Sequence, residues 1–433
     1  MTLEQAIENR TAQVAVVGLG YVGLPLAART AEVGLRTRGV DINRGRVANI
    51  NLGISDISDV ASEVLAPLVA SGLLSAHDDF AVINESDAII ICVPTPLNKT
   101  RDPDIGFIMS AAEQIAPHMK AGQIFVLEST TYPGFTREVL APMLEQASGL
   151  TAGVDFHVAF SPERIDPGNA TYGVRNTTKI VGALSEAGGQ CVRALYSAFI
   201  DQVQVVSSPD CAEMVKLLEN TFRAVNIGLV NELALMCHKL GLSVWEVIDA
   251  AATKPFGYMP FYPGPGLGGH CIPIDPLYLS WKLRSLNYQA RFIELADTIN
   301  TDMPTHVVRL VQDALNDRGK AVRGSRILVL GVAYKRDIDD YRESPAITVI
   351  DQIAEKGAVV DYYDPHVPHY FEEGTRHEGI ADLSDLESYD LGVIITDHRA
   401  FDYADICRRL PVVVDTRNAT RDVRAGQDHI YLL

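Results

Sequence analysis

Residues 13–41 read QVAVVGLGYVGLPLAARTAEVGLRTRGVD, and this stretch decides the fold. Its parts are, in order, an apolar strand, a glycine-rich turn, a helix, a second strand and an acidic residue: Gln13–Val17, Gly18–Gly23, Leu24–Val33, Leu35–Val40 and Asp41. This order is the pattern of a Rossmann unit, in which a GxGxxG turn between strand and helix holds a dinucleotide. A glycine turn in some other strand–helix unit is the alternative.

Each glycine of the turn has its own physical reason. Gly18 permits the tight turn, Gly20 lets a pyrophosphate approach the backbone, and Gly23 lets the helix pack closely on the strand. Asp41 would accept hydrogen bonds from the adenosine ribose and repel a 2′-phosphate. The expected cofactor is therefore NAD, not NADP.

The composition is that of a folded globular protein. The chain has 433 residues, of which 47% are hydrophobic, and this length predicts two to three domains. Its formal net charge of −18 argues against a nucleic-acid or anionic-membrane binder, because both need a basic face. The N-terminal residues are polar without a signal-peptide core, so we expect a cytoplasmic protein.

The six cysteines are scattered without a CxxC pattern, which predicts reduced thiols and no metal site. Five of them lie in apolar periodic segments and are expected to be buried: Cys92, Cys191, Cys211, Cys237 and Cys407. Cys271 lies elsewhere, in a glycine-rich loop.

Strands continue to alternate with helices after Asp41. The expected strands are Ala88–Val93, Gln123–Leu127 and His157–Phe160, each followed by a polar stretch. Ligands of open parallel sheets bind beyond the carboxyl ends of the strands, so these stretches are expected to line one crevice. We therefore predict a doubly wound NAD-binding domain over residues 1–205.

The pattern changes near residue 206. A long helix is expected at Cys211–Leu240, with further helices at Val244–Ala252 and Leu277–Leu286. This predicts a central helical domain over residues 206–305; its long helix fits either a dimer interface or a helix buried within the chain. A C-terminal α/β domain over residues 306–433 is expected from these segments: strand Arg326–Val332, helix Ser344–Lys356, strands Ala358–Tyr363 and Asp390–Thr396, and a final strand at Val412–Asp415.

The loop 261–276, FYPGPGLGGHCIPIDP, holds four glycines and is the first candidate for chemistry. Its Cys271 follows flexible positions and is expected to open a helix, whose dipole would favour a thiolate. Asp275, four residues on, would lie on the same helix face and orient a water or a substrate hydroxyl. A buried structural thiol is the alternative.

Two further groups carry charge. Lys216 and Asn220 lie four residues apart on the long helix and could stabilise an oxyanion together; a solvated lysine and a surface amide are the plainer reading. Lys335 and Arg342, in a charged loop, could bind phosphates; an ordinary surface loop with internal ion pairs is equally consistent. Taken together, the residues fit a cysteine-dependent oxidation in which a hydride leaves and a thioester remains.

The motifs resemble the UDP-glucose/GDP-mannose dehydrogenase family over nearly the whole chain. Seven stretches occur in the family's order: VGLGYVGLPLA, VPTPL, ESTTYPG, SPER, EMVKLLENTFRAVNI, GPGLGGHCIPIDP and GVAYKRDIDDYRES. The resemblance implies a four-electron oxidation of the C6 alcohol of a UDP-sugar. It also implies a homodimer formed by the central helix and a UDP-sugar-binding C-terminal domain.

The resemblance also assigns roles. The implied catalytic residues are Cys271 as nucleophile, Lys216 and Asn220 at the oxyanion, Asp275 beside the water, Glu163 for thioester hydrolysis and Thr130 near the cofactor. The implied NAD contacts are Gly18, Gly20, Tyr21, Val22, Gly23, Asp41, Pro94, Thr95, Thr130 and Arg342. The implied substrate contacts are Glu163, Arg164, Lys216, Asn220, Tyr262, Gly268 and Lys335.

The resemblance extends to a branch of the family. Members that act on UDP-glucose usually carry a lysine where this chain has Ile274, whereas SPERIDPGN and KPFGYMPFYPGPG are similar to the branch acting on UDP-N-acetylhexosamines. The expected substrate is UDP-N-acetylglucosamine, for surface polysaccharide synthesis, with the galactosamine and mannosamine epimers and UDP-glucose as alternatives. A two-electron dehydrogenase and a non-catalytic NAD or nucleotide-sugar sensor are the rival classes.

Overall fold

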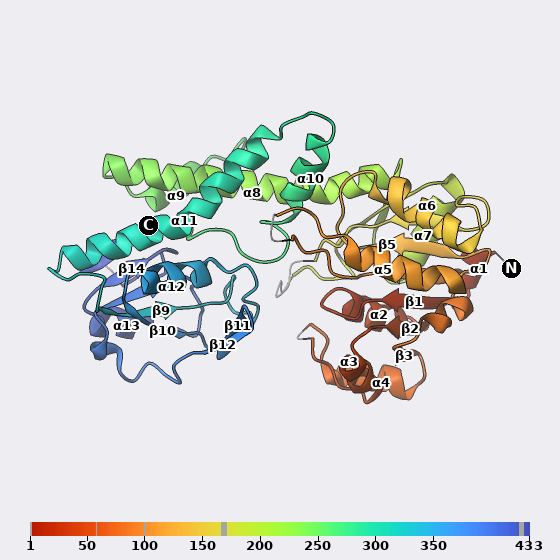
Figure 1. Cartoon of the computed structure of the whole chain (residues 1–433), viewed down its shortest axis with the longest axis horizontal. Coiled ribbons are helices and arrows are strands. Elements are labelled where there is room, and N and C mark those ends of the chain that lie inside the picture. Colours follow the sequence, from red (N-terminus) through yellow and green to blue (C-terminus); the bar gives the residue numbers. More distant parts are fainter. Residues whose placement is uncertain (1, 58, 99–100, 166–170, 424–427) are drawn as a thin grey trace. The chain divides into compact units, whose positions relative to one another are not determined.

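The computed structural model describes residues 2–57, 59–98, 101–165, 171–423 and 428–433. Two compact units divide the chain, and each is built around its own sheet of mostly parallel strands (Figure 1). The first unit comprises Met1–Glu219 and Leu277–Tyr288, and the second comprises Asn220–Pro276 and Gln289–Leu433. The predicted central domain, residues 206–305, thus contributes to both units, and the three-domain division stays a prediction.

The first unit contains an eight-stranded sheet with the order β3-β2-β1-β4-β5-β6-β7-β8. Its strands are β1 (Gln13–Val17), β2 (Arg36–Val40), β3 (Leu74–His77), β4 (Ala88–Ile91), β5 (Ile124–Leu127), β6 (His157–Phe160), β7 (Lys179–Ala183) and β8 (Val203–Val206). All neighbours are parallel except β6 and β7, which pair antiparallel. The order from β3 to β6 is that of a dinucleotide-binding Rossmann sheet.

Helices cover both faces of this sheet, which explains why its central strands are apolar throughout. Every residue of β4 and β5 is buried, as expected of strands packed on both sides. The helices are α1 (Leu3–Glu8), α2 (Gly23–Glu32), α3 (Arg44–Asn51), α4 (Ser62–Ala70), α5 (Gly106–Ile115), α6 (Ala141–Ser148) and α7 (Glu186–Ser197). Shorter helical turns are η1 (Phe80–Glu85), η2 (Ala116–His118) and η3 (Thr136–Leu140).

Two helices cross the boundary between the units along the chain. They are α8 (Pro209–Leu240) and α10 (Asp275–Arg284). No helix in the described ranges is long and apolar enough to span a membrane.

The second unit contains a five-stranded parallel sheet with the order β10-β9-β13-β14-β15. Its strands are β9 (Arg326–Leu330), β10 (Val359–Tyr363), β13 (Leu391–Ile394), β14 (Val413–Asp415) and β15 (Ile430–Leu432). A separate hairpin joins β11 (His369–Glu372) to β12 (Thr375–Glu378). The helices are α9 (Val244–Ala252), α11 (Arg291–Asn316), α12 (Pro345–Glu355) and α13 (Tyr403–Arg409), with a short turn η4 (Leu386–Ser388).

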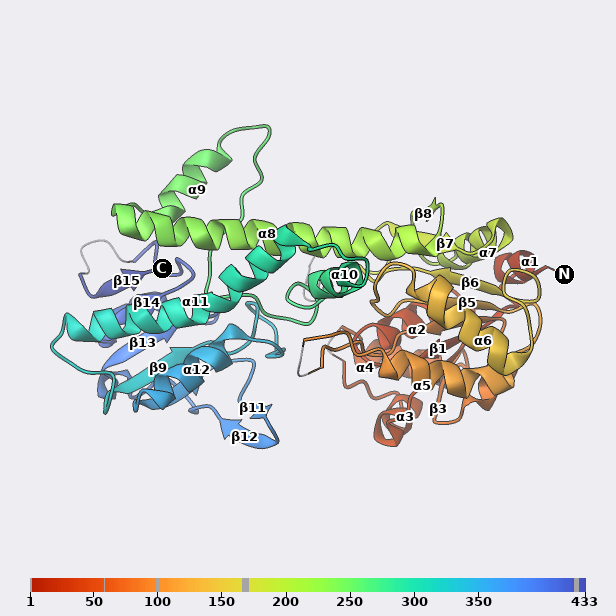
Figure 2. The ribbon, with the colours of Figure 1, turned by 45° about the horizontal axis from the view of Figure 1, so that its top comes forward.

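Alternate residues of these strands enter two separate cores. Ile327 and Val329 of β9 pack with residues of α11 and α12, which lie side by side in Figure 2. Leu328 and Leu330 of the same strand pack on the opposite face with Ile406 of α13. The period of two along a strand therefore places helices on both faces of this sheet as well.

The connections that begin the two sheets share one geometry. Gly18 follows β1 with φ of 89° and donates its N–H to Val40 at 2.8 Å; Gly331 follows β9 with φ of 86° and donates to Tyr363 at 2.9 Å. An aspartate follows the second strand in each unit, Asp41 after β2 and Asp364 after β10.

The expected fold class, two Rossmann-like α/β parts joined by a long helix, is confirmed. Each predicted strand forms, within two residues at either end. Two predictions are wrong. Cys211 is exposed on α8 and is not a buried hydrophobe, because the outward face of a helix this long meets solvent. Val412–Asp415 does not contain the final strand, because β15 follows it and pairs with β14.

Candidate functional site

The glycine-rich turn after β1 leaves no room for side chains at two positions. A Cβ on Gly18 would lie 2.7 Å from the carbonyl oxygen of Cys92, and one on Gly23 would lie 1.7 Å from that of Gly18. Gly20 is different, because no atom lies within 4 Å of its would-be Cβ. The turn is thus closed against the sheet and open over Gly20, which fits a backbone that receives a pyrophosphate.

Asp41 is hydrogen-bonded to this glycine turn. Its Oδ2 accepts the Leu19 N–H at 2.9 Å and its Oδ1 accepts the Asn43 N–H at 2.8 Å, while the residue is only 8% exposed. The carboxylate thus lies against the glycine turn at the end of β2, the position from which a ribose hydroxyl is recognised. The turn, the acid and the strand order together fit an NAD adenosine half.

Further expected cofactor contacts of this unit lie on the glycine turn and directly after β4. Tyr21 is 40% exposed on the turn and Val22 is half-buried beside it. Pro94 and Thr95 follow β4, and the Thr95 carbonyl accepts the hydroxyl of Tyr278 at 3.0 Å.

Lys216 is buried on α8 and donates to Thr130. Its Nζ lies 2.5 Å from Thr130 Oγ1, and the two residues are 7% and 9% exposed. The solvated-lysine reading is therefore excluded, and a cation faces the polar stretch that follows β5.

A buried carboxylate, which sequence reasoning left without a role, fixes the start of α8. Glu213 accepts the N–H groups of Gly134 and Thr136 at 2.6 and 2.9 Å and the Thr136 hydroxyl at 2.6 Å. Because Lys216 lies about one turn further along α8, these bonds set its position beside Thr130.

Glu163 lies just after β6 and is held by backbone donors. Its Oε1 accepts the N–H groups of Arg164 and Ile165 at 2.7 and 2.6 Å. Burial favours the neutral acid, but Lys179, these backbone donors and Lys216 outweigh it, and the pKa of Glu163 lies below its ordinary value. Part of the SPERIDPGN motif, residues 166–169, lies outside the described residues.

Arg164, an expected substrate contact, is bound within the protein. Its guanidinium donates to Glu219 at 2.5 and 3.1 Å and to the Thr178 carbonyl at 2.6 Å. The guanidinium of Arg164 is thus already hydrogen-bonded to other residues of the same chain.

The glycine-rich loop of the second unit packs against the charged loop. A Cβ on Gly268 or Gly269 would lie 2.6 or 2.8 Å from Tyr334, so only glycine allows this approach. Gly269 also donates its N–H to the Arg342 carbonyl at 3.1 Å. These contacts place the half-buried Cys271 at the end of a loop held by close packing.

Cys271 does not open a helix, which corrects the sequence prediction. Its carbonyl accepts the N–H groups of Ile274 and Asp275 at 3.1 and 2.8 Å, and α10 begins only at Asp275. Pro273 and Pro276 lack N–H donors, so the segment forms one isolated turn before the helix. Cys271 and Asp275 are still joined across that turn.

Asn220 and Asp275 form a buried pair in the same unit. Asn220 Nδ2 donates to Asp275 Oδ2 at 2.6 Å, and the residues are 9% and 2% exposed. The surface-amide reading of Asn220 is excluded. A thiol, a carboxylate and an amide are therefore linked through one turn of backbone and one hydrogen bond.

The charged loop has internal ion pairs. Arg342 donates to Asp340 at 2.7 Å, and its Nη2 lies 3.2 Å from Nδ1 of His270, the residue before Cys271. Lys335 is half-buried in the same loop. Tyr262 is 46% exposed, and its hydroxyl donates to Asp249 at 2.8 Å.

Arg417 was missed by the sequence interpretation. It follows β14, its Nε donates to the Ile395 carbonyl at 3.0 Å, and its Nη1 lies 2.6 Å from where a Gly264 Cβ would stand. Burial, with Arg336 nearby, lowers the pKa of Arg417 to about 10. Its place two residues after an apolar strand was the available signal, because carboxyl ends of parallel strands face ligands.

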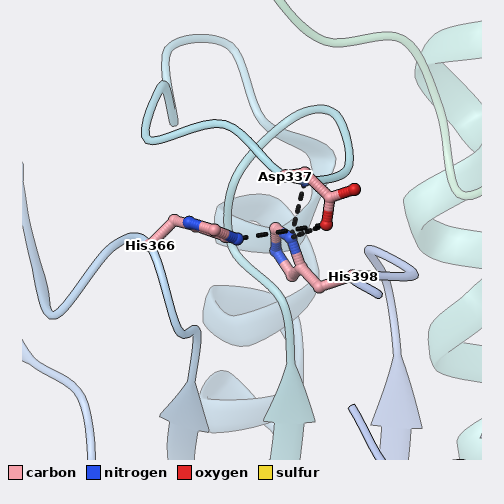
Figure 3. A group of neighbouring side chains, drawn as sticks. All are labelled: Asp337, His366 and His398. Atoms are coloured by element: carbon pink, nitrogen blue, oxygen red, sulfur yellow. Dashed lines mark hydrogen bonds and ion pairs between the residues drawn. The ribbon is translucent and has the colours of Figure 1, made fainter. Parts of the chain in front are cut away.

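A cluster of Asp337, His366 and His398 has ligand atoms within 4.8 Å of one another (Figure 3). His398 Nδ1 accepts the Asp337 N–H at 2.9 Å, so its Nε2 carries the proton that faces Asp364 Oδ2 at 3.0 Å. Both ring nitrogens are thus engaged by protein atoms. A metal ion would have to displace one of these bonds, and the cluster is better described as a hydrogen-bonded support.

Three family models match consecutive parts of the chain. They are the NAD binding, central and UDP binding domains of the UDP-glucose/GDP-mannose dehydrogenase family, at residues 12–200, 210–302 and 328–422. The last range contains Lys335, Arg342 and Arg417.

Individual relatives agree on the family and differ in their sugars. A UDP-N-acetyl-D-mannosamine dehydrogenase from Methanococcus maripaludis is 34% identical over 94% of this chain and 92% of its own length. A UDP-N-acetyl-D-glucosamine 6-dehydrogenase from Pseudomonas aeruginosa is 36% identical over 90% of this chain and 91% of its own. A solved UDP-D-ManNAc dehydrogenase from Pyrococcus horikoshii superposes with a TM-score of 0.89 at 34% identity, covering 97% of this chain and 98% of that one. The chain belongs to the UDP-glucose/GDP-mannose dehydrogenase family and is an NAD-dependent UDP-sugar dehydrogenase.

Proposed function

We propose that this enzyme oxidises the C6 alcohol of a UDP-N-acetylhexosamine to the uronic acid through a thioester on Cys271. The observation that carries the proposal is the link from Cys271 through its turn to the buried Asp275–Asn220 pair. A merely structural thiol has no need of a carboxylate and an amide held beside it. The proposed catalytic set is Cys271, Lys216, Asn220, Asp275, Glu163 and Thr130.

The proposed reaction has two oxidations followed by a hydrolysis. The C6 hydroxyl loses its proton and a hydride to give an aldehyde, and the Cys271 sulfur adds to the aldehyde carbon to form a thiohemiacetal. Loss of a second hydride and proton gives the thioester, and a water then replaces the sulfur. When bound, NAD supplies the hydride acceptor, so one sugar and one water consume two NAD and yield two NADH, three protons and the carboxylate.

The charges of the site match the charges that develop. Lys216, donating to Thr130, offers a cation to an oxyanion at C6, and the Asn220 amide offers a neutral donor. In this proposal Asp275 holds a water, and Glu163 receives the proton of the water that hydrolyses the thioester.

The proposed substrate contacts lie in both units along the chain. Glu163 and Arg164 belong to the first unit, whereas Tyr262, Gly268 and Lys335 belong to the second. We add Arg417, whose guanidinium beside Gly264 can neutralise a diphosphate.

UDP-N-acetylglucosamine is the proposed sugar, on the strength of the glycine-loop motif and the Pseudomonas relative. UDP-N-acetylmannosamine, UDP-N-acetylgalactosamine and UDP-glucose are the alternatives. We further propose a cytoplasmic enzyme of three domains, residues 1–205, 206–305 and 306–433, whose product enters surface polysaccharide.

We also propose a homodimer formed through the central helices. Within the second unit, α8 exposes Phe222, Leu229 and Met236 at intervals of seven residues, and α11 exposes Phe292 at 76%. A regular apolar stripe of this kind is typical of a helix that packs against another. Light scattering at the elution peak tests it: a dimer mass is expected, with dissociation in Leu229→Glu, and a monomer of the parent protein would refute it.

NADH absorbance with limiting UDP-sugar tests the reaction. Two NADH per UDP-N-acetylglucosamine are expected; two with another sugar would correct the substrate, and one would indicate a two-electron dehydrogenase. Cys271→Ser should bind sugar and NAD yet form no uronic acid, whereas the exposed Cys211→Ser is the matched control and should keep full turnover. Full turnover in Cys271→Ser would overturn the mechanism.

A further inference from the structure

A buried lysine lies beside Glu163 and has no place in the site predicted from the sequence. Lys179 is the first residue of β7, and its Nζ lies 2.8 Å from Glu128 Oε2 and 3.5 Å from Glu163 Oε2. The side chains of Lys179, Glu128 and Glu163 are 7%, 0% and 14% exposed. We propose that Lys179 is a positioning residue that keeps Glu163 ionised and aimed for thioester hydrolysis, and that Glu128 limits how strongly it does so.

The two oxygens of Glu163 have different partners. Oε1 accepts two backbone N–H groups, while Oε2 faces the Lys179 ammonium. Together these contacts fix the carboxylate plane, and Glu163 and Lys179 line one pocket with Val22 of the glycine turn. Glu163 therefore stays partly accessible, as a group that meets water must.

Glu128 anchors the lysine from the other side. It accepts the hydroxyl of Tyr196 as well as Lys179, and the lysine ammonium lies 5.2 Å from the Tyr196 ring centroid. Burial lowers the pKa of Lys179, but Glu128 and Glu163 outweigh it, so the pKa is raised and the lysine stays charged. One cation thus lies between two carboxylates in a place that water hardly reaches.

The charged and titratable groups around Glu163 come from several elements. They are Cys92 after β4, Glu128 after β5, Lys179 on β7, Tyr196 on α7, and Lys216 and Glu219 on α8, together with the neighbouring Arg164. Burial and Glu128 raise the pKa of Cys92, so that thiol adds no charge at neutral pH. Lys179 and Lys216 are the cations that lower the pKa of Glu163.

This inference rests on the proposed function, since it concerns the hydrolysis step. In that step a water oxygen bonds to the thioester carbon, Glu163 takes the water's proton, and the carbon–sulfur bond breaks so that its electron pair returns to Cys271. An ionised Glu163 is required, so the hydrolysis rate falls on the acid side of its pKa.

Two variants that move the acid limb of the pH–rate profile in opposite directions would distinguish a positioning role of Lys179 from a merely structural one. Lys179→Met removes the attraction and should move the acid limb to higher pH, whereas Glu128→Gln removes a competing carboxylate and should move it to lower pH. Both variants break the same buried ion pair, so a merely structural role would affect them alike. Tyr196→Phe is the matched control, because it perturbs Glu128 without changing charge and should leave the limb in place.

The measurement is decay of the Cys271 adduct by rapid quench and intact mass, with UDP-sugar and NAD, over about pH 5–9. We expect a shift of about one pH unit in Lys179→Met, equal to about tenfold slower decay on the acid limb. Lys179→Arg should restore the wild-type limb. If Lys179→Met does not fold, Glu128→Gln/Lys179→Met is compared with Glu128→Gln, and its limb should lie at higher pH than that of Glu128→Gln. No shift, or shifts in the same direction, would overturn the inference.

Glu163→Gln separates this inference from the proposed function. An adduct that persists in Glu163→Gln, together with unmoved limbs in the Lys179 and Glu128 variants, would refute only the role of Lys179. An adduct that never forms in the parent protein would refute the thioester itself.

Discussion

The Asn220 amide donates to the Asp275 carboxylate at 2.6 Å, and both groups are almost wholly buried. The Asp275 backbone N–H also donates to the Cys271 carbonyl at 2.8 Å, so the carboxylate is held on the turn that carries the thiol. Asp275→Asn keeps the shape of the side chain and loses the charge that is proposed to hold a water beside Cys271. We expect kcat to fall by about 10²-fold or more, measured by NADH formation. Asp302→Asn, an exposed change on α11, should leave kcat unaltered, and an active Asp275→Asn would contradict the assignment.

Two glycines of the same turn should respond differently to a methyl group. Gly23→Ala places a Cβ 1.7 Å from a backbone oxygen, and relieving this clash costs about 1–3 kcal/mol, so its melting temperature should fall. Gly20→Ala meets no atom within 4 Å and should melt like the parent protein, yet gain less stability from NAD. Thermal unfolding with and without NAD measures both. If NAD raised the melting temperature of Gly20→Ala as much as that of the parent protein, a pyrophosphate over Gly20 would be refuted.

The charge of Asp41 should exclude NADP. Asp41→Asn keeps an oxygen for the Leu19 or Asn43 N–H but removes the repulsion of a 2′-phosphate. The preference for NAD over NADP should fall by about tenfold or more, measured as the ratio of kcat/KM. Equal rates with the two cofactors in the parent protein would refute the role of Asp41.

Asp364 should stabilise the second unit in a pH-dependent way. Burial raises its pKa, but the bonds from His398 and from backbone N–H groups outweigh this, so the pKa lies below the ordinary value. A depressed pKa gives stability that is present above the unfolded-state pKa of about 4 and is lost as the pH falls through the folded-state pKa. Asp364→Asn should lower protection of the Val332 and Ala333 amides by about 1–3 kcal/mol near pH 7.

Hydrogen exchange at those two amides is the local measurement. The difference between parent and variant should shrink as the pH is lowered below about 4. A difference that grows toward acid pH would mean that the sign of the assigned shift is wrong.

Much of the fold follows from local patterns. The turn Gly18–Gly23, the acid at Asp41 and the apolar runs of β4 and β5 predicted the centre of the first sheet, because each signal lies within one strand–helix unit. Its strands β3, β7 and β8 were missed. The hairpin of β11 and β12 was missed, because β12 reads TRHE and has no apolar alternation. β15 was missed because three residues carry too little pattern.

The site could be predicted only as far as motifs reach. Cys271, Lys216 and Asp275 were proposed from the sequence, but the burial of Lys216 depends on the bonds by which Glu213 fixes α8, which the periodicity of the sequence does not show. Lys179 shows the limit most clearly. Its partner Glu128 is 51 residues away, and nothing in the stretch TTKIVGA marks a lysine that enters a core.

The connections after β1 and β9 match in geometry, but the aspartates that follow the second strands of the two sheets have different partners. Asp41 accepts the N–H groups of Leu19 and Asn43 and lies at the end of β2, where a ribose is expected to bind. The carboxylate of Asp364 accepts hydrogen bonds from the N–H groups of four residues and from the His398 ring; the four residues are Val332, Ala333, His366 and Val367. Asp364 therefore fastens the loops at the end of its own sheet, whereas Asp41 is the aspartate expected to meet the ribose of a dinucleotide.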